Sequence, residues 1–151
     1  MALHIVLVEP EIHWNTGNVG RTALAVGATL HLVGPLGFSL DAAQLKRAGL
    51  DYWERVPLQR WPSWAAFEAE LPTLGTPWLF STKVQRAYWD ASYTADTVLI
   101  FGKETAGLPP SLLHRYADHA VTIPMVQGAP RSLNLSTAAA LAAYEVLRQL
   151  R

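Results

Sequence analysis

Two short apolar runs near the start of the chain, separated by a segment of helical periodicity, constrain its fold most strongly. Residues 3–8 and residues 29–33 are strand-like, and the first run has too few polar residues for a strand with one face in water. Between them, Val19, Ala23 and Val26 recur at helical spacing. This order of strand, helix and strand predicts a βαβ unit, and hence a parallel sheet that is covered on both faces.

The rest of the chain continues the alternation of strands and helices. A helix is expected over residues 63–70 with Ser63 as its N-cap, and Pro110 can open a short helix through residue 113. The last helix is expected to start near Asn134. The remaining elements are expected to be a short helix over residues 41–48 and strands over residues 78–82, 97–101 and 120–123. The predicted fold class is therefore α/β, with a mostly parallel sheet and helices on both faces.

The composition fits one globular domain over residues 1–151. Half of the residues are hydrophobic, but no apolar run is long enough to span a bilayer. The chain has no cysteine, which excludes disulfides and thiolate metal sites, and no secretion signal is visible, so we expect a cytoplasmic protein. The 12 basic and 12 acidic residues cancel, whereas a nucleic-acid-binding protein usually carries a basic face. Four basic residues nevertheless lie close together in the sequence, where solvated surface charge is the simpler interpretation: Lys46, Arg47, Arg55 and Arg60.

The first of three polar junctions between a strand and a helix spans residues 9–21. Asn15 is a candidate N-cap of the helix that follows, and Arg21 would then lie in the first turn of that helix. A cation at that end opposes the helix dipole, so its presence indicates an anionic partner such as phosphate. An ion pair between Arg21 and Glu9 or Glu11 is an equally good interpretation of this residue alone. The glycines here do not form the G-x-G-x-x-G pattern of dinucleotide-binding proteins.

Two further junctions have the same construction. After the strand over residues 97–101, Glu104 lies in a loop bounded by glycine and proline. Glu104 could accept hydrogen bonds from backbone amides or from a ligand, or it could hold its own loop in place. After the strand over residues 120–123, Ser132 and Asn134 lie at the start of the last helix. Either of these two could cap that helix, which is the commoner role of such residues.

Taken in order, the three junctions resemble the three motifs of the SPOUT superfamily of RNA methyltransferases. The matching residues are Asn15 with Arg21, then Phe101-Gly102-x-Glu104, and then Ile123-Pro124-Met125-Val126 with Ser132-x-Asn134. The match covers essentially the whole chain. Residues 9–12 and 47–52 narrow it to the minimal enzymes of the superfamily that methylate the wobble nucleotide of tRNA.

This resemblance implies a fold, an activity and a set of partners. The implied fold is an α/β sheet whose C-terminal segment threads through a loop and forms a deep trefoil knot. The implied activity is methylation of the ribose 2′-hydroxyl of the wobble cytidine or uridine of tRNA. The methyl donor is S-adenosylmethionine (AdoMet), the product is S-adenosylhomocysteine, and no metal takes part. The enzymes of this type are homodimers, and their active site draws on both subunits.

The resemblance also assigns roles to individual residues by matching position. The expected AdoMet site is formed by Phe80, Gly102, Ile123 and Ser132. The expected catalytic set is Arg21, with Asn15, Glu104 and Asn134 in support. The expected further contacts to RNA are Arg47, Arg55 and Tyr144, and the alternative position for Tyr144 is the dimer interface. Because a guanidinium scarcely deprotonates in a protein, we expect Arg21 to bridge the hydroxyl oxygen and the phosphate rather than to remove a proton.

Three other functions stay open at this point. One is a 2′-O-methyltransferase that acts on another tRNA position or on ribosomal RNA, although the chain has no room for the usual RNA-binding extension. Another is a non-catalytic RNA-binding module of the same fold. The third is a small nucleotide-binding oxidoreductase, which the missing glycine pattern disfavours. The five histidines show no spacing typical of a metal site.

Overall fold

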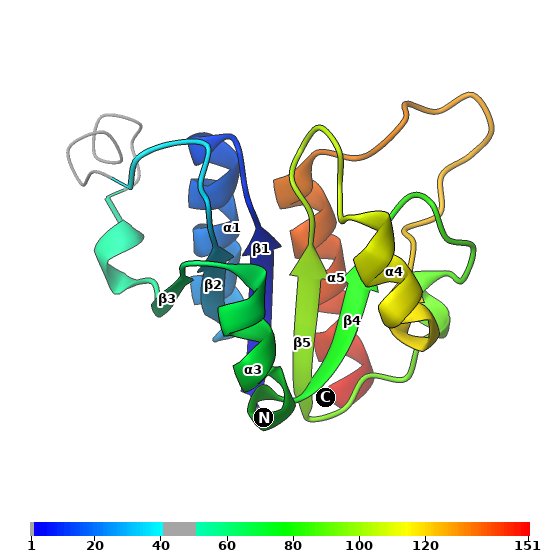
Figure 1. Cartoon of the computed structure of the whole chain (residues 1–151). Coiled ribbons are helices and arrows are strands. Elements are labelled where there is room, and N and C mark those ends of the chain that lie inside the picture. Colours follow the sequence, from blue (N-terminus) through cyan, green and yellow to red (C-terminus); the bar gives the residue numbers. More distant parts are fainter. Residues whose placement is uncertain (1, 41–50) are drawn as a thin grey trace.

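The computed structural model describes residues 2–40 and 51–151, which form a six-stranded sheet in the order β3-β2-β1-β5-β4-β6 (Figure 1). The strands are β1 (Ala2–Val8), β2 (Thr29–Val33), β3 (Leu58–Trp61), β4 (Thr76–Phe80), β5 (Asp96–Phe101) and β6 (Ala120–Val121). Each pair of neighbouring strands is parallel. The carboxyl ends of the strands therefore lie along one edge of the sheet, at the top of Figure 1.

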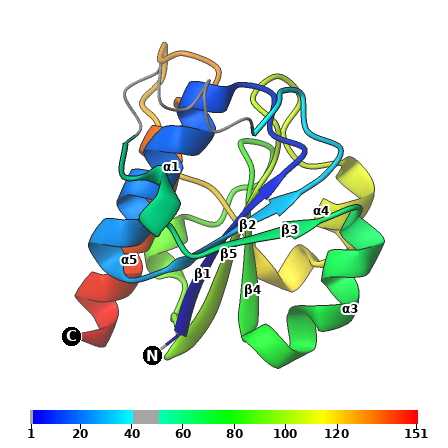
Figure 2. The same ribbon diagram turned by 90° about the vertical axis from the view of Figure 1, so that its left-hand side faces the viewer.

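Helices cover both faces of the sheet (Figure 2). On one face, α1 (His13–Val26) and α5 (Leu135–Leu150) pack on a core that includes Leu3, Ile5 and Leu7 of β1. On the other face, α3 (Trp64–Leu74) and α4 (Pro110–Arg115) cover a core that includes Val6 and Val8. Successive side chains of β1 thus enter opposite cores, which explains its almost continuous apolar sequence. The described residues also form three short 3-10 helices, η1 (Trp53–Arg55), η2 (Tyr88–Asp90) and η3 (Ala117–His119).

Several sequence predictions are confirmed. The β1–α1–β2 unit is present, and Gly27 ends α1 in the left-handed conformation, with φ of 72°. The hydroxyl of Ser63 caps α3 by accepting a hydrogen bond from the amide of Ala66. Asn134 is the N-cap of α5, whose buried face includes Ala139 and Val146.

The predicted start of the first helix is wrong. Helix α1 begins at His13 with Ile12 as the N-cap residue, and no side chain of its own segment caps it. Asn15 is therefore a buried residue of the first turn rather than the N-cap. Arg21 is the ninth residue of the helix and lies in its third turn, so the argument from the helix dipole does not apply to it.

The strands at both edges of the sheet also differ from the sequence predictions. Strand β3 was not predicted, because an edge strand that pairs only with β2 and has exposed central residues carries little apolar signal. Strand β6 ends at Val121, two residues before the predicted end at residue 123. The chain then pairs with the connection after β4 instead, through hydrogen bonds from the amide of Thr122 to the carbonyl of Arg86 and from the amide of Tyr88 to the carbonyl of Thr122. The helix predicted over residues 41–48 falls outside the described residues.

The connection from β4 to β5 is held between β6 and α5. Thr122 bonds to it on the side of β6, as just described. Gln149 of α5 accepts a hydrogen bond from the amide of Tyr93 at 3.0 Å and donates one to the carbonyl of Ala91 at 2.9 Å. The C-terminal segment therefore contacts this connection on both sides. In the part of the chain that the structure describes, we find no helix long and apolar enough to cross a membrane.

Candidate functional site

The carboxylate of Glu104 joins the second junction to the first. One of its oxygens accepts a hydrogen bond from the amide of Glu11 at 2.8 Å, and the other accepts one from the amide of Ile12 at 2.9 Å. Ile12 is the N-cap residue of α1, whose backbone donor has no partner within the helix, and Glu11 directly precedes it. Glu104 therefore caps α1 from a loop more than ninety residues away, which explains why no local side chain does so.

The same carboxylate fixes the direction of a longer polar chain, formed by Glu104, Asn15 and Asn134. A carboxylate only accepts hydrogen bonds, so the Nδ2 amide group of Asn15 must point toward Oε2 of Glu104, 3.3 Å away. Oδ1 of Asn15 then faces Nδ2 of Asn134, at 3.0 Å. Oδ1 of Asn134 is left to accept from the amides of Ser136 and Thr137 in the first turn of α5. The polar chain thus connects the three motifs and caps two helices.

A second set of hydrogen bonds joins the same two loops, this time with the carboxylate on the first loop and the donors on the second. Glu11 accepts hydrogen bonds through Oε1 from both the amide and the hydroxyl of Thr105, at 3.0 and 2.8 Å. These bonds lower the pKa of Glu11, the backbone one most. Glu9 lies 4.0 Å from Lys103 in a weak ion pair. Glu9 and Glu11, the two possible ion-pair partners of Arg21 in the sequence, therefore interact with other residues.

Arg21 is exposed on α1 and lies above the ring of Tyr52, with its guanidinium carbon 5.7 Å from the ring centre. Tyr52 is itself held on α1, because its hydroxyl donates to the carbonyl of Gly17 at 2.8 Å. Burial raises the pKa of Tyr52, and the nearby Arg21 charge opposes that rise. Arg21 and Arg55 both line a groove of about 440 Å³ between α1 and η1, and Asp51 also lines it. Two guanidiniums beside one aromatic ring form a surface suited to a phosphate and a nucleoside.

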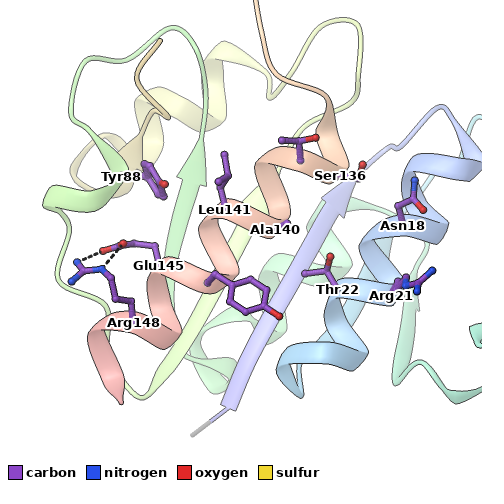
Figure 3. A pocket seen from close by; sticks show the side chains of 11 residues that line it. Asn18, Arg21, Thr22, Tyr88, Ser136, Ala140, Leu141, Glu145 and Arg148 are labelled. Carbon is purple, nitrogen blue, oxygen red and sulfur yellow. Dashed lines mark hydrogen bonds and ion pairs between the residues drawn. The ribbon is translucent and has the colours of Figure 1, made fainter. Parts of the chain in front are cut away.

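Arg21 also lies at the rim of a larger groove of about 710 Å³ between α1 and α5 (Figure 3). Asn18 and Thr22 line it from α1. Tyr144, an expected RNA contact, lines it from α5 and is 53% exposed. At the far end, Glu145 and Arg148 pair with each other at 2.7 Å. The groove is mostly apolar between these charged ends.

The residues expected at the AdoMet site lie at the end of β4, where Phe80 is the last residue, and on the loops that follow β5 and β6. The ring of Phe80 is buried and stacks on Phe101, with ring centres 4.7 Å apart, so it belongs to the core. Gly102 lies where its loop closes tightly, because a Cβ there would come within 2.1 Å of the carbonyl carbon of Gly107. Ile123 is half-buried and Ser132 is exposed.

These loops have features that a nucleoside donor such as AdoMet requires. Adenine and the methionine chain need apolar surface next to free backbone groups. The segment from residue 122 to residue 134 exposes Val126 to 82% and also exposes Leu133. These two side chains offer apolar surface to such a donor. The residues present therefore fit the group.

The structure brings together only part of the expected site. Asn15, Glu104 and Asn134 form one bonded chain. Arg21 lines two grooves, and in the described part of the chain neither lining includes Gly102, Ile123 or Ser132. Arg47 lies outside the described residues. Sequence reasoning missed Tyr52 and Thr105, since neither has a local pattern that reveals a partner far along the chain.

The comparison with known families excludes one of the open alternatives. A profile of the SpoU rRNA Methylase family matches residues 2–144. This chain belongs to the SpoU methylase family. The trefoil-knotted α/β fold that the resemblance implied is the fold of this family, and the rival interpretation as a nucleotide-binding oxidoreductase is thereby excluded.

Individual SpoU methylases show how far the likeness extends. The tRNA (cytidine(34)-2′-O)-methyltransferase of Burkholderia pseudomallei (strain 1106a) is 44% identical over 148 residues, which are 97% of this chain and 94% of that protein. A solved structure from work on the 2′-OH methylation of C/U34 on tRNA superposes with a TM-score of 0.91 at 47% identity, over 99% of this chain and 96% of that one. An AdoMet-bound rRNA methyltransferase from Sinorhizobium meliloti superposes with a TM-score of 0.86 at 27% identity, over 99% of this chain and 57% of the other.

Among residues 2–40 and 51–151, no group of three or more histidine, aspartate or glutamate side chains could hold a metal ion. The histidines that do meet are His4 and His31, whose ring nitrogens lie 2.9 Å apart on the α3 side of the sheet.

Proposed function

We infer that this protein is an AdoMet-dependent methyltransferase that methylates the ribose 2′-hydroxyl of the wobble nucleotide, cytidine or uridine 34, of tRNA. The observation that carries this inference is the polar chain, which joins the three motif loops into one bonded unit. Membership of the SpoU family and near-complete coverage of relatives named for this reaction support it. A site on another tRNA position or on ribosomal RNA is the alternative.

We assign the AdoMet site to the loops that contain Gly102, Ile123 and Ser132. Phe80 would contribute through the loop that follows it, because its ring is in the core. AdoMet supplies a methyl group already activated by the sulfonium, so the protein mainly has to place the hydroxyl in line with it. The exposed Val126 and Leu133 would cover the apolar parts of the donor.

Arg21 is the proposed catalytic residue. Its guanidinium stays protonated and has a planar fork of donors, so it can hold the 2′-oxygen and the adjacent phosphate together. In this arrangement it stabilises negative charge on the oxygen as the proton leaves to phosphate or water. Tyr52 holds Arg21 in position, and Asn15, Glu104 and Asn134 act as positioning residues.

The separation of Arg21 from the proposed AdoMet loops supports a homodimer. The grooves lined by Arg21 do not, in the described part of the chain, include Gly102 or Ser132. We therefore propose that Arg21 of one subunit acts with the AdoMet loops of its partner. The α5 side of the groove between α1 and α5, where Leu141 and Tyr144 are exposed, is the proposed subunit contact. Arg55 would then add to the binding of RNA phosphate, with an affinity that falls steeply with salt.

The test is incubation of the protein with labelled AdoMet and unmodified tRNA, followed by nucleoside mapping. We expect label on the ribose of nucleotide 34, and label on a base or at another position would contradict the proposal. Arg21→Lys should lower kcat by about 100-fold or more while AdoMet affinity stays unchanged, because a lysine cannot bridge two oxygens in the same fork. Arg60→Lys, an exposed arginine of β3, is the matched control and should retain the wild-type rate.

A further inference from the structure

Trp14 is an exposed indole on the same helix face as Arg21. It lies in the first turn of α1 and is 56% exposed. Residues 14, 18 and 21 are spaced as i, i+4 and i+7, and all three are exposed. Trp14, Asn18 and Arg21 therefore form one row along α1. The two ends of this row are separated by about 10 Å along the helix axis.

The base of this row is held rigidly. The ring of His13 packs edge-on against Trp14, with ring centres 5.0 Å apart and planes at 75°. The ring of His13 also lies near that of Phe38, with ring centres 6.3 Å apart. The backbone just before them is fixed by the hydrogen bonds from Ile12 and Glu11 to Glu104. The indole is thus presented to solvent on a preorganised helix end, at little cost in conformational entropy on binding.

We propose that Trp14 stacks on an unpaired base of the RNA whose ribose and phosphate are held at Arg21. This inference rests on the proposed function. Recognition of single-stranded RNA commonly combines a cation on the backbone with an aromatic ring under a base, because every base has a π-face. A stacked strand rises about 3.4 Å per nucleotide, so a row of about 10 Å corresponds to about three nucleotide steps. Trp14 would therefore contact another base of the same loop and not the methylated nucleotide itself.

The experiment measures binding of an anticodon stem-loop RNA to the full-length protein in the presence of AdoMet. We expect Trp14→Ala to weaken binding by about 5- to 100-fold and Trp14→Phe, which keeps a ring, by less than about 5-fold. AdoMet affinity should not change. Trp89→Ala is the matched control, because Trp89 is 51% exposed but lies on η2, outside the row, and it should bind RNA as the wild type does.

A set of stem-loops that each lack one base of the loop identifies the stacked nucleotide. Removal of that base should weaken binding to the wild type but should cost no further affinity with Trp14→Ala, since the partner ring is already absent. Equal losses for both proteins at every position would overturn the proposal. So would wild-type affinity of Trp14→Ala, or a change of oligomeric state that accounts for its loss of binding, because the indole would then belong to a subunit contact.

The proposed function is tested separately, by detection of the 2′-O-methyl nucleoside. A wild-type protein that binds the stem-loop but leaves no 2′-O-methyl nucleoside contradicts the proposed activity, and the comparison of Trp14 variants still decides the stacking. A wild-type protein that does not bind the stem-loop overturns both.

Discussion

Asn134 donates a hydrogen bond from Nδ2 to Oδ1 of Asn15 at 3.0 Å, and so joins residues 119 positions apart in the sequence. The same Asn134 caps α5 through its other amide atom. One side chain therefore links the start of α5 to the first turn of α1, and through Asn15 to Glu104. Because the carboxylate of Glu104 only accepts hydrogen bonds, these contacts allow each of the two amide groups a single orientation.

Substitutions of Asn134 separate its two roles. Asn134→Ser keeps a good N-cap but is too short to reach Asn15, so the free energy of unfolding should fall by about 1 kcal/mol. Asn134→Ala loses both interactions and should lose about 2 kcal/mol. Urea denaturation measures both. Ser63→Ala, which removes only the cap of α3, is the control for a lost cap without a lost crosslink. If Asn134→Ser unfolds as the wild type does, the contact with Asn15 adds nothing.

Glu104→Gln should be destabilising although it preserves size and shape. Three donors converge on this carboxylate: the amides of Glu11 and Ile12 and the Nδ2 group of Asn15. A glutamine would turn its own NH₂ group toward one of these donors. We expect a loss of about 2 kcal/mol in urea denaturation at pH 7. Glu70→Gln, on the exposed face of α3, should change stability by less than about 0.5 kcal/mol. Equal effects of the two substitutions would contradict the capping role.

The free energy of unfolding should decrease as the pH is lowered, because of His31. This residue is fully buried, and burial, with a smaller effect of the nearby His4, lowers its pKa from 6.5 to about 4. Trp61 donates to its Nδ1 at 3.0 Å, so the proton of the neutral ring lies on the nitrogen that faces His4. As pH falls from 6.5 to 4, the unfolded chain binds a proton that the folded chain excludes. The free energy of unfolding should therefore decrease by about 3 kcal/mol across this window and then level off.

The control for this pH effect is His31→Gln, which can still accept from Trp61 and donate to His4 but does not titrate in this range. Its urea denaturation midpoint should vary less between pH 7 and pH 4 than that of the wild type. The same pH dependence in both proteins would assign the effect to other groups.

A comparison of two alanine substitutions tests how tightly the loop after β5 closes. In Gly102→Ala the new Cβ would overlap backbone atoms of Gly107 and Leu108, so the loop must shift, at a cost of about 1–3 kcal/mol. Gly107→Ala meets no neighbour within 4 Å and bears only the cost of its φ of 69°, about 1 kcal/mol. Because the same loop belongs to the proposed AdoMet site, Gly102→Ala should also weaken AdoMet binding by about tenfold in calorimetry. Unchanged AdoMet affinity would remove Gly102 from that site.

Local patterns were sufficient to predict most of the fold. The apolar run of β1, the helical spacing of Val19 and Ala23, and the cap at Ser63 each depend on neighbours within a few residues. Such patterns report the period of an element and which of its faces is buried, so the α/β class and the parallel sheet followed from them. Edge strand β3 was missed because it buries too little to leave a pattern.

The sequence by itself also determined which residue types stand at the three strand-to-helix junctions, and the match of Asn15, Arg21, Glu104 and Asn134 to known motifs. Only the tertiary structure decided how they are used. Glu104 caps α1 in place of Asn15, and Arg21 lies on the third turn over Tyr52. These contacts cross 31 to more than ninety positions of the chain, and they depend on where the parallel strands place their carboxyl ends. A hydrogen bond between distant loops leaves no periodic trace in either segment, so no local pattern could have predicted it.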